Sequence, residues 1–234
     1  MIEWSQLVHP WFTLDSDTIK ALQDLSPILG RVPPETDDIQ WNLLLTVWSA
    51  YAKSVSALSG VKNYELWQSE AVAHQYEELP KHVTLWGIID GVQGSMHSAL
   101  DNLGHAVWLV EYPQKAGSYY PASFNQLFDP KMGLIGAATS TKLSSELIHT
   151  LTAIYTNDGK KIIDLNNHSK HKRSLIPRQP IPLELQNNPL FQPLIAQQDS
   201  REMPVWFAEV KNMAENILPH FWQALPLVMT DAGY

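Results

Sequence analysis

The 234-residue chain contains no cysteine, which excludes disulfide bonds, thiolate zinc sites and cysteine nucleophiles. It also lacks an apolar run of the roughly 18–20 residues that a membrane-spanning helix needs. Its first residues, MIEWSQ, lack the basic and apolar regions of a signal peptide. From these absences we expect a cytoplasmic protein with no membrane segment.

Sequence motifs for cofactor chemistry are missing as well. The chain has no phosphate loop, no G-x-G-x-x-G and no G-x-S-x-G pattern. We therefore expect no cofactor. His97, Asp101 and His105 follow one another at i, i+4 and i+8 on one predicted helix, and histidine with carboxylate is a plausible metal set. Residues eight apart are separated by about 12 Å along a helix, so at most one pair could join an ion, and we predict hydrogen-bonded core groups rather than a metal site.

The amino-acid composition is typical of a folded protein, and its charged residues are distributed unevenly along the chain. Apolar residues make up 44% of the chain, which supports a sizeable core, and the net charge is −8. Residues 160–178, however, hold six basic side chains and one acid, so this segment carries +5 and the remainder −13. A basic patch on an acidic body favours one specific anionic partner over diffuse attraction to nucleic acid.

Apolar residues recur with a period of 3.6 in several segments, and no run alternates with period two. The sequence thus predicts an all-α helical bundle with long irregular loops and no substantial sheet. We expect one domain over 1–234, with a core at 37–173 and a C-terminal extension at 174–234. The predicted helices, after a short apolar stripe at 19–25, cover 37–58, 64–79, 82–110, 140–155, 160–172 and 203–225.

Local signals set the expected boundaries. Ser59-Gly60 should end one helix, Pro219 should kink or divide another, and residues 229–234 should be loose. Residues 111–140 read as a long surface loop with one short turn near 123–128. Three glycines on nearly one side of the fourth helix suggest close approach of another helix, with a kink as the competing interpretation; they are Gly87, Gly91 and Gly94.

The densest polar cluster is residues 165–173, LNNHSKHKR, on the second half of the helix predicted at 160–172. Imidazole, guanidinium and amide groups together can hold a phosphate, and a histidine can move a proton near neutral pH. The alternative is a solvated helix end whose cations complement the helix dipole. Both interpretations stay open at this stage.

Two stretches together resemble a group of bacterial helical proteins. Residues 96–104, MHSALDNLG, are similar to the pattern L-R-S-A-L-D-H-L-A, and residues 165–172, LNNHSKHK, to L-N-x-x-D-K-H-R. Tyr119-Tyr120-Pro121 resembles the aromatic-proline element between them. The group looks like part of the HEPN superfamily (higher eukaryotes and prokaryotes nucleotide-binding), and the resemblance covers roughly residues 83–175.

This resemblance implies a helical bundle, often a homodimer, that binds or cleaves RNA or a nucleotide without a metal, in a defence or toxin-type system. His97, Ser169 and Lys172 stand where the pattern has Arg, Asp and Arg. No arginine is followed four to six residues later by histidine, as in the active ribonucleases of the superfamily. Whether the chain is an enzyme therefore stays open.

The resemblance also implies roles for individual side chains. His171 would be the general acid or base, Arg173 and Lys170 would hold the scissile phosphate, and Asp101 and Asn166 would orient them. The nucleic-acid-binding residues would be Lys170, Lys172 and Arg178. Two other classes remain: a non-catalytic module that binds a protein partner, and a helical metalloprotein that uses His97, Asp101 and His171.

Overall fold

The computed structural model describes residues 16–29, 38–74, 78–115, 123–171, 176–178, 189 and 198–234. Its α-helices are α2 (Ser16–Leu29), α3 (Asp38–His74), α4 (Glu78–Glu111), α5 (Ser145–Ile154), α6 (Lys160–His171) and α9 (Met203–Asp231). Short helical turns form η1 (Pro113–Lys115), η2 (Phe124–Phe128) and η3 (Tyr155–Gly159), and the strands are β1 (Ile176–Arg178) and β2 (Gln198–Glu202). The all-α expectation is confirmed, with one short strand pair beside the helices.

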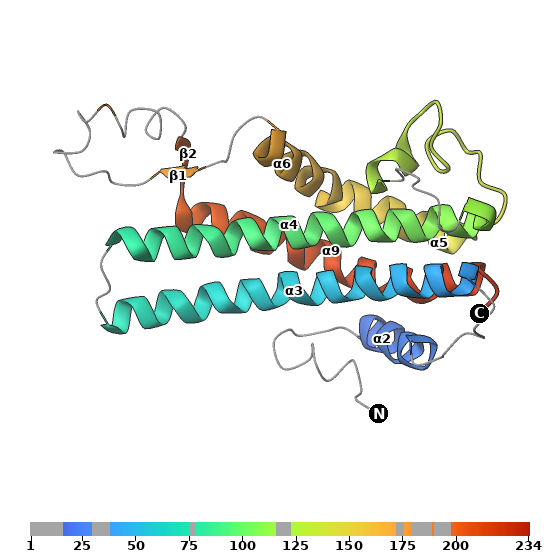
Figure 1. Cartoon of the computed structure of the whole chain (residues 1–234), viewed down its shortest axis with the longest axis horizontal. Coiled ribbons are helices and arrows are strands. Elements are labelled where there is room, and N and C mark those ends of the chain that lie inside the picture. Colours follow the sequence, from blue (N-terminus) through green and yellow to red (C-terminus); the bar gives the residue numbers. More distant parts are fainter. Residues whose placement is uncertain are drawn as a thin grey trace.

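Helices α3 and α4 form a long antiparallel pair along the longest axis of the molecule (Figure 1). With 37 and 34 residues they extend about 55 and 50 Å at about 1.5 Å per residue. The predicted break at Ser59-Gly60 is wrong, because α3 continues through it. A Cβ on Gly60 would lie 2.5 Å from Cγ2 of Val92, so this glycine allows α3 to approach α4. Its role is close packing rather than helix termination.

The glycine stripe on α4 does not play the corresponding role. A Cβ built on Gly87, Gly91 or Gly94 meets no atom within 4 Å, and Gly87 and Gly91 are exposed. The expected close approach of another helix at these glycines is therefore wrong. They lie on an open side of α4, away from the α3 contact at Gly60.

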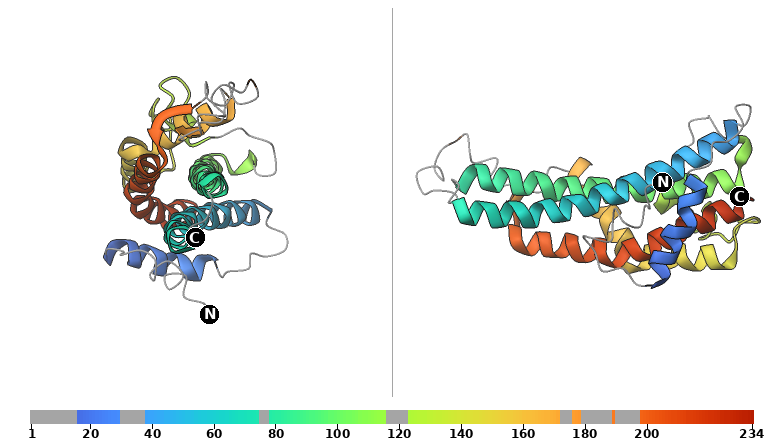
Figure 2. Two further views of the ribbon diagram at one scale, coloured as in Figure 1. Left: turned by 90° about the vertical axis from the view of Figure 1, so that its left-hand side faces the viewer. Right: turned by 90° about the horizontal axis from the view of Figure 1, so that it is seen from below.

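Helix α9 completes the bundle. It packs against α2, α3, α4 and α5, and Figure 2 shows it running beside the α3–α4 pair, with α2 crossing it. Phe221 and Trp222 are fully buried within the common core. Although α9 belongs to the expected C-terminal extension, its apolar side chains thus share one core with α3 and α4.

The end of α9 differs from the sequence-based expectation. The helix runs to Asp231 instead of ending near 225, and Pro219 and Pro226 lie within it. Met229 is buried, and the Asp231 carboxylate accepts the backbone N–H of Ser144 at 2.7 Å. The prediction of a loose tail at 229–234 is wrong because this contact and the buried face hold the end of the helix in place.

Glu111, the last residue of α4, anchors the long loop that follows. Its carboxylate accepts the hydroxyls of Ser140 and Thr141 at 2.9 and 2.7 Å, and the backbone N–H groups of Thr141 and Lys142 at 3.1 Å. The short turn expected near 123–128 is confirmed as η2. Helix α5 begins at Ser145, later than the predicted start at 140, with Ser144 as its N-cap.

The five residues of η3 join α5 to α6 through a π-helical kink. Asn157 has φ −86° and ψ 23°, and Asp158 has φ 115°. Residues other than glycine rarely adopt such a positive φ. A Cβ on Gly159 would lie 2.5 Å from the carbonyl oxygen of Ile154, so the turn requires glycine there. The segment Asn157-Asp158-Gly159 thus forms a turn that redirects the chain within a nearly continuous helix.

The two strands pair in parallel, with Ile176 aligned to Gln198 and Arg178 to Glu202. They lie beside the start of α9 (Figure 1). Within the described parts of the chain, no helix combines the length and the apolar character needed to cross a membrane.

Candidate functional site

The residues singled out from the sequence lie mainly on two helices that pack against each other. Asp101 is on α4 and Asn166 on α6, and Figure 1 shows α6 on the side of α4 opposite α3, running in the reverse direction. The side chains of His168 to His171 and of Arg178, and all of residues 172–175, lie outside the described residues. The positions of the following predicted groups therefore stay predictions: Lys170, His171, Lys172, Arg173 and Arg178.

Asp101 has one partner that the sequence spacing suggested, His97, and one that it did not, the backbone of Phe124. Its Oδ1 accepts the backbone N–H of Phe124 at 3.3 Å, and its Oδ2 lies 3.4 Å from Nδ1 of His97, one turn earlier on α4. The Asp101 side chain is 36% exposed, so it is not deeply buried. Its described contacts come from η2 and from its own helix. The expected contact between Asp101 and His171 lies outside the described residues.

The histidines of α4 occupy different environments. His97 is buried and faces Asp101, whereas His105 is half-buried and lines a small recess with Trp108 and Tyr112. Burial lowers the pKa of the His105 imidazole, so this ring is neutral at pH 7. Among the residues that the structure describes, no three His, Asp or Glu side chains gather closely enough to hold a metal ion.

Two buried amides lie on the helices that meet here. Asn166 on α6 is 4% exposed and Gln93 on α4 is 1% exposed. Among the residues that the structure describes, the Nδ2 atom of Asn166 and both amide atoms of Gln93 have no hydrogen-bond partner. Nearly all buried polar groups in folded proteins are satisfied, so each exception requires an explanation. Sequence analysis identified Asn166 but missed Gln93, whose polar group within an apolar helix face was the available signal.

The charges on the first half of α6 are paired within the structure. Lys160 donates to Asp164 at 2.5 Å, and Lys161 forms an ion pair with Asp158. The Lys160–Asp164 pair is largely exposed and contributes little to stability, whereas in the second pair the Lys161 side chain is exposed and that of Asp158 is only 13% exposed. They nevertheless compensate the two lysines at the start of the basic segment.

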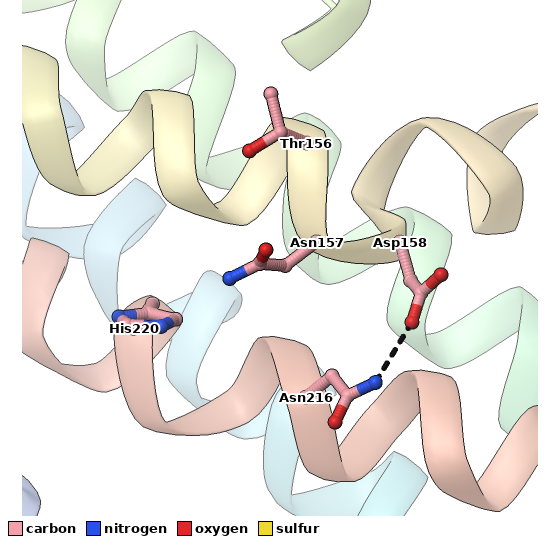
Figure 3. Close-up of a pocket in the computed structure, with 5 residues that line it drawn as sticks. All are labelled: Thr156, Asn157, Asp158, Asn216 and His220. Carbon is pink, nitrogen blue, oxygen red and sulfur yellow. Dashed lines mark hydrogen bonds between the residues drawn. The ribbon is translucent and has the colours of Figure 1, made fainter.

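A second polar site, which sequence analysis did not predict, lies between η3 and α9. A pocket of about 470 Å³ is lined by Thr156, Asn157, Asp158, Asn216 and His220. Figure 3 shows the Asn157 side chain extending into the space between the two elements, with Asn216 and His220 on the α9 side. Asn157-Asp158-Gly159 was readable as a turn, but its contact with α9 joins residues 58 positions apart, as in the bond from Asn216 to Asp158.

Asp158 is the most constrained residue of this pocket. Its Oδ2 accepts Nδ2 of Asn216 at 2.9 Å, and its Oδ1 pairs with the Lys161 ammonium. Burial alone would raise the pKa of the Asp158 carboxyl, but the hydrogen bonds from Lys161 and Asn216 outweigh burial and lower it. The carboxylate is therefore ionised and fully engaged at neutral pH.

Comparison of the chain with protein-family models, curated proteins and solved structures gives no match. The functional assignment of this protein therefore rests on its own residues, charges and geometry.

Proposed function

We propose that this protein binds RNA or a nucleotide through the basic stretch at the end of α6. The observation behind the proposal is that the acidic partners of the lysines lie only at the start of that helix. Lys160 and Lys161 are paired with carboxylates, whereas residues 165–178 contain no acid. Four cations of this segment therefore have no acid beside them in the sequence, and they are the residues expected to contact phosphate: Lys170, Lys172, Arg173 and Arg178.

The buried amides support a positioning role beside this stretch. Asn166 is one turn before Lys170 on α6, and its buried Nδ2 has no hydrogen-bond partner within the described part of the chain. A buried amide N–H without an acceptor is unfavourable, so a hydrogen bond from it to a newly arrived acceptor stabilises the bound state. We propose that Asn166 and Gln93 hold the end of α6 in a bound state, by donating to a ligand oxygen or to a polar group of residues 168–173.

The resemblance to HEPN proteins extends the proposal to catalysis. In that case His171 exchanges a proton with the ribose hydroxyl or the leaving oxygen, and Lys170 and Arg173 stabilise the charge on the phosphate. Asp101 would act through His97, which lies 3.4 Å away. Cleavage by these groups requires no metal ion, so it would continue in EDTA.

The binding proposal is tested by fluorescence anisotropy with a labelled single-stranded RNA of about 20 nucleotides. The variant Lys170→Ala/Lys172→Ala/Arg173→Ala should lose at least about tenfold in affinity at 0.15 M salt. The matched control Lys160→Ala/Lys161→Ala changes two exposed lysines that are already paired, so it should lose less than about threefold. Log affinity should fall with log salt by about 0.7 for each phosphate contacted.

Two results would overturn this assignment: no saturable RNA binding by the wild-type protein, or equal losses in the two lysine variants. Cleavage is tested separately, by incubating the same RNA with protein and EDTA. His171→Ala should abolish cleavage while leaving the thermal unfolding midpoint nearly unchanged. Binding without cleavage in the wild-type protein would assign the chain a binding role only.

A second candidate function, a module that binds a protein partner, is favoured by the exposed apolar side chains of α3. Leu45 and Leu66 are 56% and 53% exposed. At 100° per residue they lie within about 60° of each other around the helix, about 30 Å apart along it. Two exposed leucines on one side of a helix favour a protein interface there, including one with a second copy of the chain.

Sedimentation velocity tests the self-association version of this candidate. Leu45→Ser/Leu66→Ser should shift a concentration-dependent dimer to monomer while leaving the helical circular-dichroism signal intact. A wild-type protein that remains monomeric at 100 micromolar would exclude the homodimer and leave a different protein as the partner.

A further inference from the structure

The polar pocket between η3 and α9 lies apart from the basic stretch. The lining residues Thr156 to Asp158 precede α6, whereas the basic residues follow its last turns, about 18 Å further along the helix. The pocket volume of about 470 Å³ falls within the range of ordinary small-molecule sites. Such sites are mostly apolar, but every residue that lines this one is polar.

The pocket carries no uncompensated charge among its described groups. Its single carboxylate, Asp158, is engaged by Lys161 and Asn216, and no lysine or arginine lines the pocket. A phosphate would therefore find no free cation there, and a metal ion would find only one carboxylate, already saturated. The charge balance favours a neutral ligand.

The remaining groups offer both donors and acceptors. Asn157 makes no side-chain hydrogen bond within the described part of the chain, and its amide reaches into the space facing α9 (Figure 3). Asn216 uses Nδ2 toward Asp158, which leaves Oδ1 as an acceptor. The His220 imidazole presents two ring nitrogens that can form hydrogen bonds. Alternating donors and acceptors of this kind match adjacent hydroxyl groups, each of which both donates and accepts.

The backbone of η3 fixes this arrangement. Asp158 is held at φ 115°, a conformation that is unfavourable for a residue other than glycine and that clusters at ligand sites. The Asp158 bonds to Asn216 and Lys161 connect the kink to α9 and α6. Asn157 is thereby positioned in the opening before any ligand arrives.

We propose that the pocket of Asn157, Asn216 and His220 binds a neutral polyhydroxylated ligand of monosaccharide size. The site is open to solvent and lacks an apolar wall, so the dissociation constant should be on the order of millimolar. This site is independent of the proposed RNA-binding stretch, and variants in one should leave the other unaffected.

The test is a titration of the full-length, isotopically labelled protein with D-ribose and D-glucose, followed by NMR. The expected result is a saturable shift of the Asn157 and Asn216 side-chain amides and of the His220 ring with at least one sugar. Inorganic phosphate and calcium chloride serve as separate probes and should give no saturable shift there. Asn157→Ala should weaken sugar binding at least about tenfold, as should His220→Ala, while RNA affinity stays unchanged.

Asn63→Ala is the matched control, because Asn63 is an exposed asparagine on α3, outside the pocket. It should keep the wild-type response to sugar. The proposal is overturned if neither sugar produces a saturable shift up to about 100 mM, if phosphate or calcium saturates these signals instead, or if Asn63→Ala weakens binding as much as Asn157→Ala. Failure of RNA binding alone leaves this proposal standing.

Discussion

The indole N–H of Trp222 on α9 donates to Oγ of Ser54 on α3 at 2.9 Å, across 168 residues of chain. Both residues are fully buried, and the Ser54 hydroxyl donates in turn to the carbonyl oxygen of Tyr51 at 2.6 Å. This short chain of hydrogen bonds joins α3 to α9 inside the apolar core and fixes their relative register.

Removing the Ser54 hydroxyl should destabilise the bundle. Ser54→Ala takes away the acceptor of the Trp222 indole in a fully buried position, which should cost about 1–3 kcal/mol of unfolding free energy in urea. The control is Ser56→Ala, since Ser56 is exposed and its hydroxyl lies 3.4 Å from the hydroxyl of Ser95. That change should stay within about 0.5 kcal/mol. Equal losses would contradict a special role for Ser54.

Truncation of a buried side chain at the centre of α4 should destabilise the protein strongly. Leu100 is completely buried, so Leu100→Ala should lower the unfolding free energy by about 2–5 kcal/mol. Leu45→Ala removes the same atoms from a side chain that is 56% exposed and should cost far less. Denaturant unfolding of the two variants measures the difference. A loss below about 1 kcal/mol for Leu100→Ala would mean that α4 is peripheral.

Two glycine-to-alanine substitutions should change the free energy of unfolding in opposite directions. Gly91 is an exposed helical residue with free space around it, so Gly91→Ala should stabilise the protein by about 0.5–1 kcal/mol. At Gly60 the new Cβ would press on a methyl group of Val92, a buried and stiff β-branched residue, and cost about 1–3 kcal/mol.

A double variant separates overpacking at Gly60 from other causes. In Gly60→Ala/Val92→Ala the methyl group that would collide with the new Cβ is absent. The double variant should therefore lose less unfolding free energy than the sum of the losses in the two single variants. Thermal unfolding of all four proteins provides the comparison. Strictly additive losses would show that Val92 is not the obstacle.

The Glu111 anchor should make stability depend on pH. Burial opposes ionisation of this carboxyl, but hydrogen bonds from Thr141, Ser140 and Lys142 outweigh burial and hold its pKa below the ordinary value of 4.5. A lowered pKa in the folded state means that the stabilisation is complete above pH 4.5 and is lost as the pH falls through the folded-state value.

Glu111→Gln should therefore cost about 1–3 kcal/mol at pH 7, and the gap to the wild-type protein should shrink below pH 4.5. Urea unfolding at intervals from pH 7 to pH 3 measures this. Glu215→Gln is the control, because Glu215 contacts Lys211 only at 3.8 Å near the surface. A gap that stays constant with pH would show that ionisation of Glu111 is irrelevant.

The sequence predicted the helical class because periodicity along one segment needs no knowledge of its neighbours. Helix ends were harder, since Gly60 and Asp231 act through partners distant in the chain: Val92 lies opposite the first, and Ser144 bonds to the second. A glycine that allows packing and one that ends a helix are identical in the sequence. Tertiary contact decides between them.

The candidate site was predictable only in part, for the same reason. The resemblance identified Asp101 and Asn166, and Gln93 was visible only as a polar residue on an apolar helix face, but the Phe124 backbone that meets Asp101 left no local signal. The polar pocket depends on a 2.9 Å bond between Asp158 and Asn216. No short-range pattern connects two such positions.

The position of α9 in the bundle has a consequence for biosynthesis. This helix packs against α2, α3, α4 and α5, yet residues 203–231 are translated after all of them. Until they leave the ribosome, the apolar faces that receive Trp206, Phe221 and Trp222 have no cover. The α3–α4 pair can form early through contacts of its own, but closure of the core must follow translation of nearly the whole segment to Asp231.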